Sequence, residues 1–263
     1  MDLVIATGNP HKVDEFRALF APARGVRVLG LKDLAGAGRF VEPAETGATF
    51  EENVRIKAEQ YARQTGRLCL ADDSGLEVDG LGGRPGVISS HYATGGRETG
   101  ATREERDRAN NRLVLEQLHG VPPERRSARF VCVLALAAPP GFAPTPRMLA
   151  AKPYDAPNDP LLDLAPALRR CAAEPGAAHV LLRARGEFEG RIGVPPRVPS
   201  GRHGFGYDPL FLVKHPTGSP PTAYAQTGAE LDPESKNRLS HRARAANIML
   251  DLLVRSGIAD TPA

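Results

Sequence analysis

Short apolar runs separated by turn residues recur along most of the chain. They occupy residues 3–6, 26–29, 68–71 and 129–137, and each is followed within two residues by glycine, proline or aspartate. Runs of this length are typical of buried strands. Because segments with helical spacing of apolar residues lie between them, the pattern predicts an α/β protein.

Three segments carry clear signals of a helix. Thr49 and Glu52 have the spacing of a capping box, which predicts a helix that runs to about Arg63. A strongly charged helix is expected over residues 103–119. The last helix is predicted to begin at Asp232-Pro233, because its apolar positions 239, 243, 246, 250 and 253 share one face.

Two further predictions concern strands next to polar residues. The strand over residues 68–71 is expected to end at the turn Asp72-Asp73-Ser74-Gly75. Residues 180–183 and 188–192 are expected to form a pair of strands.

Glycine and proline are enriched, with 27 and 24 of the 263 residues, against a combined average of roughly 12%. Nine of the prolines fall within residues 139–178. Their spacing predicts an irregular stretch, with a broken helix over residues 161–173 at most.

Charge and cysteine content exclude several classes of protein. The 34 basic and 31 acidic residues leave a net charge of +3, too little for a duplex-binding surface. Three widely spaced cysteines fit reduced thiols better than disulfides. No apolar run is long enough to span a membrane, and the N-terminus lacks the pattern of a signal peptide. We therefore expect a cytoplasmic protein with neither a nucleic-acid nor a membrane partner.

Two turns that follow apolar runs carry candidate chemistry. The run Thr7-Gly8-Asn9-Pro10-His11-Lys12 offers backbone N–H groups, a helix N-terminus and a lysine to a phosphate, although a plain turn uses the same residue types. Asp72 and Asp73 are adjacent carboxylates whose charge needs a partner, and Mg²⁺ is suited to that role. Glu45 and Glu52 are further candidate ligands, and an aspartate-rich turn is the structural alternative.

Two later segments add an aromatic loop and a basic helix. Gly204-Phe205-Gly206-Tyr207-Asp208-Pro209 offers a ring on which a nucleobase can stack, or alternatively a loop anchored on the core. Lys236, Ser240, His241 and Arg242 belong to the last predicted helix. In an unbroken helix His241 lies about 140° from Lys236, so one ligand reaches both only through a break in the helix, through long side chains or by approaching from the start of the helix. The structural alternative is a solvated basic face.

These motifs, taken in order, resemble the inosine triphosphate pyrophosphatase family. The resemblance is carried by the first turn, by residues 45–57, by residues 71–76, by the aromatic loop and by residues 235–242. It implies a long mixed central sheet flanked by helices, with two lobes and an active site in the cleft between them. Residues 1–263 would then form one two-lobed domain with a proline-rich insertion at about 139–178.

The resemblance also implies an activity and assigns residues to it. Members of the family hydrolyse non-standard purine nucleoside triphosphates, such as ITP, dITP and XTP, to the monophosphate and pyrophosphate with Mg²⁺, as homodimers. Asp73 would be the catalytic residue and, with Glu45, a metal ligand. The residues expected to bind substrate are Thr7, Gly8, Asn9, Pro10, His11, Lys12, Lys57, Ser74, Phe205, Gly206, Tyr207, Asp208, Lys236, His241 and Arg242. The alternatives are a pyrophosphatase for other nucleotides and a non-catalytic protein that binds nucleotide or nucleic acid.

Overall fold

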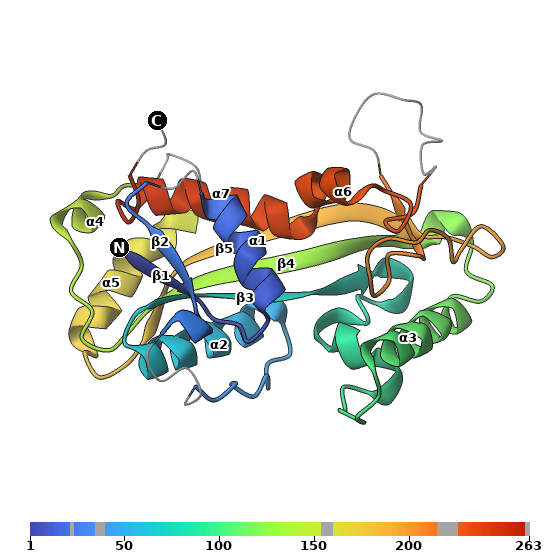
Figure 1. Ribbon diagram of the computed structural model, residues 1–263, viewed down its shortest axis with the longest axis horizontal. Coiled ribbons are helices and arrows are strands. Elements are labelled where there is room, and N and C mark those ends of the chain that lie inside the picture. The colour runs from blue at the N-terminus through green and yellow to red at the C-terminus, as the bar shows by residue number, and fades with distance from the viewer. Residues whose placement is uncertain (22–23, 35–39, 154–159, 215–225, 261–263) are drawn as a thin grey trace. The chain divides into compact units, whose positions relative to one another are not determined.

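A six-stranded mixed sheet with helices around it forms the framework of the protein (Figure 1). The computed structural model describes residues 1–21, 24–34, 40–153, 160–214 and 226–260. The strands are β1 (Asp2–Ile5), β2 (Arg27–Gly30), β3 (Leu68–Val78), β4 (Ser127–Ala138), β5 (His179–Ile192) and β6 (Phe211–Val213). Their order in the sheet is β2-β1-β3-β4-β5-β6. β1 pairs in parallel with β2 and β3, whereas β5 and β6 are antiparallel, which confirms the predicted mixed α/β class.

The helices are α1 (Pro10–Phe20), α2 (Phe50–Thr65), α3 (Arg103–Gln117), α4 (Pro146–Ala150), α5 (Leu164–Ala173), α6 (Pro233–Leu239) and α7 (His241–Arg255). Short 3-10 segments include η4 (Gly86–Thr94) and η6 (Pro160–Asp163). No helix in the described part of the chain is both long and apolar enough to cross a membrane.

The chain divides into two compact units. The first unit comprises residues 1–73, 133–186 and 244–263, and the second comprises residues 74–132 and 187–243. β3, β4 and β5 each contribute residues to both units. The single two-lobed domain, and an active site between its lobes, stay predictions.

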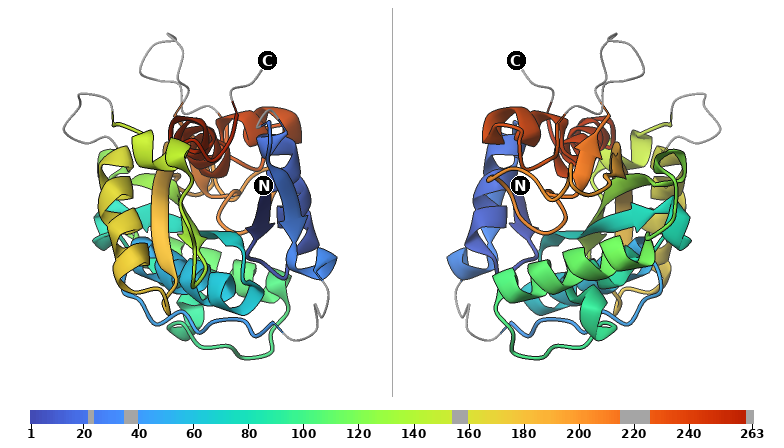
Figure 2. Two further views of the ribbon diagram at one scale, coloured as in Figure 1. Left: turned by 90° about the vertical axis from the view of Figure 1, so that its left-hand side faces the viewer. Right: turned by 90° about the vertical axis from the view of Figure 1, so that its right-hand side faces the viewer.

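In the first unit, α2 begins and ends where the sequence indicates. The Thr49 side chain accepts a hydrogen bond from the Glu52 backbone N–H at 3.2 Å, and the helix ends at Gly66, whose φ of 65° suits glycine. The apolar face of α2, which includes Phe50, Val54 and Tyr61, is buried. Figures 1 and 2 show α2 and the first-unit part of α7 on opposite sides of the strands.

The proline-rich stretch contributes to the core of the first unit. The predicted broken helix is confirmed, as η6 followed directly by α5. Leu164, Leu168 and Cys171 on α5 and Met148 on α4 are buried. Two helices of this stretch therefore supply apolar side chains to the interior of the first unit.

The second unit has an apolar core of its own. Its buried residues come from the second half of β3, from η4, α3, β5 and β6, with Phe188 and Phe211 among the largest. Figure 2 shows α3 on the face turned to the viewer in its right-hand view. Asn110 on α3 accepts a hydrogen bond from the Ala93 N–H and donates to the Ser89 carbonyl, at 2.8 and 3.2 Å. These bonds fix η4 against α3.

Three predictions about individual elements are wrong. β3 does not end at Asp72 but continues through Asp73, Ser74 and Gly75 to Val78. The two strands expected at 180–183 and 188–192 are one strand, β5. The last helix is two helices, α6 and α7, because Ser240 between them is extended, with φ −61° and ψ 154°.

Candidate functional site

Lys12 on α1 neutralises the first of the two adjacent aspartates on β3. Its Nζ donates to both carboxylate oxygens of Asp72, at 3.0 and 2.8 Å. The Asp72 side chain is only 3% exposed, whereas that of Lys12 is 31% exposed. Because neighbouring strand residues point to opposite faces, the Asp73 carboxylate needs different partners.

Asp73 faces Lys57 of α2, and Lys57 also contacts Glu45. The Lys57 Nζ lies 3.5 Å from Asp73 Oδ1 and 3.0 Å from Glu45 Oε1. Burial raises the pKa of Asp73 to about 6; the Lys57 charge opposes this shift, and the Glu45 and Asp72 carboxylates add to it. Burial by itself lowers the pKa of Lys57, but the carboxylates of Asp73, Asp72 and Glu45 raise it above its usual value. Three carboxylates thus lie near two lysines, so the negative charge of the group is not fully balanced. The carboxylates are those of Asp72, Asp73 and Glu45, and the lysines are Lys12 and Lys57.

Asn53 links this group to the turn before α2. Its buried side chain hydrogen-bonds to Asp73, which lowers the pKa of that carboxyl, and its Oδ1 accepts from the Gly47 N–H at 2.7 Å. A Cβ at Gly47 would lie 2.6 Å from the Glu52 Cβ and 2.7 Å from Asn53 Oδ1, so the close approach requires glycine. The Glu52 carboxylate accepts from the Ala48 N–H at 2.6 Å and so stabilises the turn.

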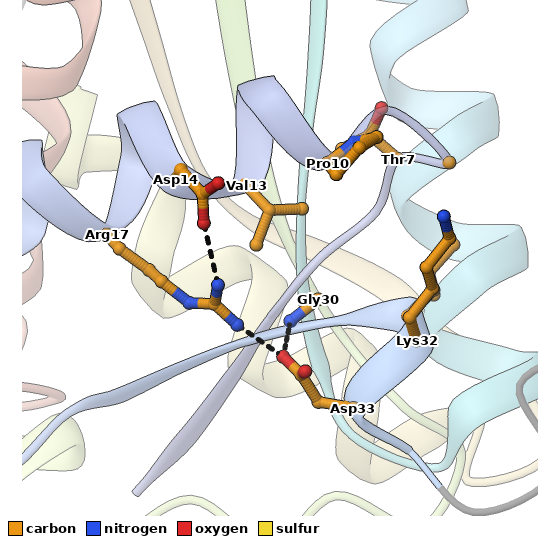
Figure 3. Close-up of a pocket in the computed structure, with 10 residues that line it drawn as sticks. Thr7, Pro10, Val13, Asp14, Arg17, Gly30, Lys32 and Asp33 are labelled. Carbon is orange, nitrogen blue, oxygen red and sulfur yellow. Dashed lines mark hydrogen bonds and ion pairs between the residues drawn. The ribbon is translucent and has the colours of Figure 1, made fainter.

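The turn from Thr7 to Lys12 lies at the start of α1, beside a cavity of about 240 Å³ (Figure 3). The Thr7 Oγ1 accepts a hydrogen bond from the Asn9 N–H at 3.2 Å, while Gly8, Asn9 and Pro10 are exposed. The His11 side chain lies outside the described part. Residues of α1, β2 and the following 3-10 turn complete the lining, which comprises Thr7, Gly8, Pro10, Val13, Asp14, Arg17, Gly30, Leu31, Lys32 and Asp33. Figure 3 shows the Arg17 guanidinium between Asp14 and Asp33, at 2.8 and 2.5 Å, so that arginine is already paired.

The carboxylate oxygens of Asp73 and Glu45 suit a hard cation that takes its remaining ligands from water or substrate phosphates. Both carboxylates contact the same ammonium group, and the pKa of Asp73 is raised chiefly by burial, with smaller contributions from the charges of Glu45 and Asp72. Within the described ranges, no group of three or more His, Cys, Asp or Glu side chains is placed to hold a metal ion. Mg²⁺ is usually bound through one or two carboxylates together with water and substrate phosphates, so two carboxylates match this cation.

The second unit holds a separate cluster around residues 204–208. Asp208 is buried, accepts from the Phe205 N–H at 2.8 Å and forms a short ion pair with Lys236 Nζ. At Gly204, φ is 76°, and a Cβ would lie 2.2 Å from Asp208 Oδ2 and 2.6 Å from Lys236 Nζ. A side chain at Gly204 would therefore disrupt this ion pair. The Tyr207 hydroxyl donates to the Ser89 carbonyl at 2.7 Å, and burial raises the pKa of Tyr207.

Phe205 is the exposed ring of this cluster. It is 56% exposed, an unusual state for so large an apolar side chain. The Arg103 guanidinium carbon lies 4.2 Å from the ring centroid, and Lys236 Nζ lies 5.2 Å from it. Both distances are within the range of cation–π attraction. Phe205 is therefore a surface platform and not a core anchor, whereas Tyr207 in the same loop is the anchor.

The break between α6 and α7 changes the position of the basic residues. Asp232 caps α6 as predicted, accepting from the Ser235 N–H at 2.8 Å, and the Ser240 hydroxyl accepts from the Ala243 N–H at 3.1 Å at the start of α7. Because Ser240 is extended, the angle expected for one continuous helix does not apply to Lys236 and His241. The His241 ring stacks on Phe130, with centroids 5.3 Å apart.

The structure thus brings the predicted residues together in two groups. In the first unit Lys57 contacts Glu45 and Asp73, Lys12 contacts the neighbouring Asp72, and Thr7, Gly8 and Pro10 line the cavity beside α1. The second-unit group contains residues 205–208 and Lys236. Ser74 follows Asp73 on β3 as the first residue of the second unit. His241 stacks beside the core of the second unit, and Arg242 follows it on α7.

Sequence reasoning gave no role to four residues that hold these groups in place. Asn53 lies four residues before Lys57 on α2, so helical spacing predicts that the two share a face. The others are on α3, namely Arg103, Asp107 and Asn111, and their spacing of four residues is the signal that was available.

Fold and site together define a mixed α/β protein with a carboxylate–lysine group around the buried Asp73 and an exposed aromatic platform. A sequence model of the Ham1 family matches residues 3–150 and 167–252. The chain belongs to the Ham1 family, which confirms the resemblance seen in the motifs. Residues 151–166, outside the match, lie within the proline-rich stretch, so the family pattern extends into both ends of that stretch.

Curated relatives and solved structures agree with this membership. The chain is 39% identical to the dITP/XTP pyrophosphatase of Bacillus licheniformis over 252 residues, which cover 96% of this chain and 97% of the relative. It is 37% identical to the enzyme of the same name from Bacillus subtilis, over 96% of each chain. The structure of a HAM1 protein from Coxiella burnetii superposes with a TM-score of 0.66 at 33% identity, covering 97% of this chain and 98% of the other.

Proposed function

We propose that this protein hydrolyses non-standard purine nucleoside triphosphates, such as ITP, dITP and XTP, to the nucleoside monophosphate and pyrophosphate. Removing such nucleotides from the nucleotide pool would be its cellular role. The observation that carries the proposal is the contact of Lys57 with both Glu45 and the buried Asp73, in a chain similar along nearly its whole length to dITP/XTP pyrophosphatases. The family supplies the site of attack, the α-phosphorus.

In the proposed reaction Asp73 accepts a proton from the attacking water. A pKa of about 6 suits this role, because a base works best when its pKa lies near the working pH. Lys57 holds Asp73 and Glu45 in place and adds positive charge beside the phosphates. Lys12, Ser74 and the backbone of the turn Thr7–Pro10, with His11 after it, bind the triphosphate.

The magnesium proposal rests on the same carboxylates. Asp73 and Glu45 would hold Mg²⁺, which when bound draws charge from the phosphate oxygens. The two-carboxylate donor set and its excess negative charge support this assignment.

The second-unit group would bind the base. Phe205 offers its ring for stacking, and Gly206, Tyr207, Asp208 and Lys236 shape the loop around it. His241 and Arg242 would donate hydrogen bonds to the 6-oxo group of the purine. The amino group of adenine would leave those donors without an acceptor, and a mismatch of this kind discriminates strongly.

A panel of nucleotides tests the proposal directly. Pyrophosphate release is measured from ITP, XTP, dTTP and ATP with Mg²⁺ and with EDTA. We expect release from ITP and XTP that far exceeds release from ATP and dTTP and is lost in EDTA. Equal turnover of all four would overturn purine selectivity, and binding of ITP without any release would indicate a sensor instead of an enzyme.

We further propose that the protein acts in the cytoplasm as a homodimer, without a membrane or nucleic-acid partner. Cys69, Cys132 and Cys171 are buried and not part of a disulfide, which supports a reducing compartment. The dimer rests on the family resemblance alone. Size-exclusion chromatography with light scattering tests it, and a monomeric mass at micromolar concentration would contradict it.

A further inference from the structure

One face of α3 holds the loop that carries Phe205. Arg103, Asp107 and Asn111 follow one another at intervals of four residues, which places them on the same side of the helix. Asp107 Oδ2 accepts from the Gly206 N–H at 2.8 Å, and Asn111 Nδ2 donates to the Gly206 carbonyl at 3.0 Å. The backbone N–H and the carbonyl of Gly206 are thus both fixed by side chains of α3.

Arg103, the first residue of the series, contacts the ring of Phe205 itself. The guanidinium carbon of Arg103 lies 4.2 Å from the centroid of the Phe205 ring, a stacking distance that leaves one ring face covered. Gly206, next to the ring, has a φ of 62°, so its backbone takes a conformation that few other residues adopt. A loop of this kind keeps its shape only where neighbouring groups hold it.

The platform is anchored from the opposite end as well. The Tyr207 hydroxyl donates to the Ser89 carbonyl, which also accepts from Asn110 of α3. The carboxylate of Asp208 accepts a hydrogen bond from the backbone N–H of Phe205 and so fixes the start of the loop. α3 therefore determines the position of the loop at Gly206 and, through η4, at Tyr207.

We propose that Arg103, Asp107 and Asn111 are positioning residues for the nucleobase of the substrate. Asp107 and Asn111 fix the backbone beside Phe205, and Arg103 stacks on the ring and holds it in position for the base. The proposal rests on the proposed function, because it takes Phe205 as the base platform. It concerns the base alone, so the groups that bind phosphate are unaffected by changes on α3.

Matched variants of α3 test this inference. Asp107→Ala removes the acceptor, whereas Asp107→Asn keeps an oxygen that accepts from Gly206. Arg103→Ala uncovers the ring. Arg112→Ala is the control, because Arg112 lies nine residues after Arg103, on the opposite face, and its contact with Glu116 is exposed. Each variant is assayed with ITP and, as competitive inhibitors, inosine monophosphate and pyrophosphate.

Asp107→Ala is expected to raise KM for ITP about tenfold, equivalent to about 1.4 kcal/mol, with kcat within about threefold of wild type. The inhibition constant of inosine monophosphate rises in parallel, and that of pyrophosphate stays unchanged. Arg103→Ala has a smaller effect of the same kind. Asp107→Asn and Arg112→Ala stay within about twofold of the wild-type values.

Two results would overturn the inference. In one, Asp107→Ala has the wild-type KM and the wild-type inhibition by inosine monophosphate. In the other, it weakens inhibition by pyrophosphate as much as by inosine monophosphate, which indicates general damage to the fold. A wild-type protein that releases no pyrophosphate would refute the proposed function instead. In that case, calorimetric titration of the same variants with inosine monophosphate and pyrophosphate still decides the inference.

Discussion

Lys12 and Asp72 form a two-pronged ion pair across sixty positions of sequence, with Lys12 Nζ 3.0 and 2.8 Å from the two carboxylate oxygens. The pair leaves Asp73 as the carboxylate that faces Lys57 and Glu45. Adjacent residues of one strand thus have different roles, because their side chains leave opposite faces of the sheet.

Lys12→Met is expected to lower the free energy of unfolding by about 2–4 kcal/mol, because it leaves the Asp72 carboxylate buried without its lysine. The double variant Lys12→Met/Asp72→Asn should recover at least half of that loss, as urea denaturation will measure. Arg55→Met is the control. It removes an exposed pair with Glu59 at 3.4 Å and should cost less than about 0.5 kcal/mol. A double variant as unstable as the sum of the two single variants would contradict this account.

Asp73→Asn is expected to abolish nearly all pyrophosphate release from ITP without unfolding the protein. The folded-state pKa of about 6 is above the usual value of 3.8, so ionised Asp73 destabilises the fold as pH rises through this range. The amide of the Asp73→Asn variant is neutral, so this buried charge and its destabilising effect are absent. The thermal midpoint of the metal-free variant at pH 7 should therefore equal or exceed that of wild type. Wild-type turnover in this variant would refute the assigned role of Asp73.

Gly204→Ala should weaken substrate binding more than Gly206→Ala does. Both glycines have positive φ, so each substitution costs about 1–2 kcal/mol of backbone strain. Only at Gly204 does the added Cβ also meet Asp208 and Lys236, whereas nothing lies within 4 Å at Gly206. We expect the larger increase in KM for ITP with Gly204→Ala, measured beside the thermal midpoints. Equal KM values for the two variants would show that the Asp208–Lys236 pair does not matter for binding.

Locally determined features were predictable from the sequence, and those that depend on distant partners were not. The cap at Thr49 and the buried face of α2 follow from residues within one helix. The continuation of β3 through Asp72 and Asp73 did not, because its carboxylates are compensated by Lys12 and Lys57 from other elements. The same holds for the second group, where the motif around Phe205 was found but its support by Asp107 was not. The spacing of four residues on α3 shows that Arg103, Asp107 and Asn111 share a face, but it does not show that residue 107 bonds to residue 206.

The proline-rich stretch offers a matched pair of leucines. Leu168 on α5 is buried, whereas Leu149 on α4 is 64% exposed. Leu168→Ala should lower the free energy of unfolding by about 2–5 kcal/mol, and Leu149→Ala should change it by less than about 0.5 kcal/mol. Urea denaturation measures both. If the two variants are equally stable, α5 is not part of the core of the first unit.

Glu230 provides a test of pH dependence at a residue to which the proposed function assigns no role. It accepts two hydrogen bonds from Arg197, at 3.1 and 2.7 Å, one from the Thr227 N–H at 2.8 Å and one from the Ser200 hydroxyl. The hydrogen bonds from Arg197, Ser200 and Thr227 lower the pKa of Glu230 to about 2 from its ordinary 4.5. The unfolded chain therefore takes up this proton first as the pH falls. The stabilisation is complete above about pH 4.5 and is lost as the pH approaches 2.

Glu230→Gln should consequently lower the free energy of unfolding by about 1 kcal/mol at pH 7, the scale of a partly exposed ion pair with good geometry. The difference from wild type should shrink steadily between about pH 4.5 and pH 2, as thermal denaturation at a series of pH values will measure. Glu124→Gln is the control, because Glu124 is exposed and this substitution removes the same charge. A difference between Glu230→Gln and wild type that stays constant down to pH 2.5 would mean that the carboxylate charge is not what Arg197 and Ser200 stabilise.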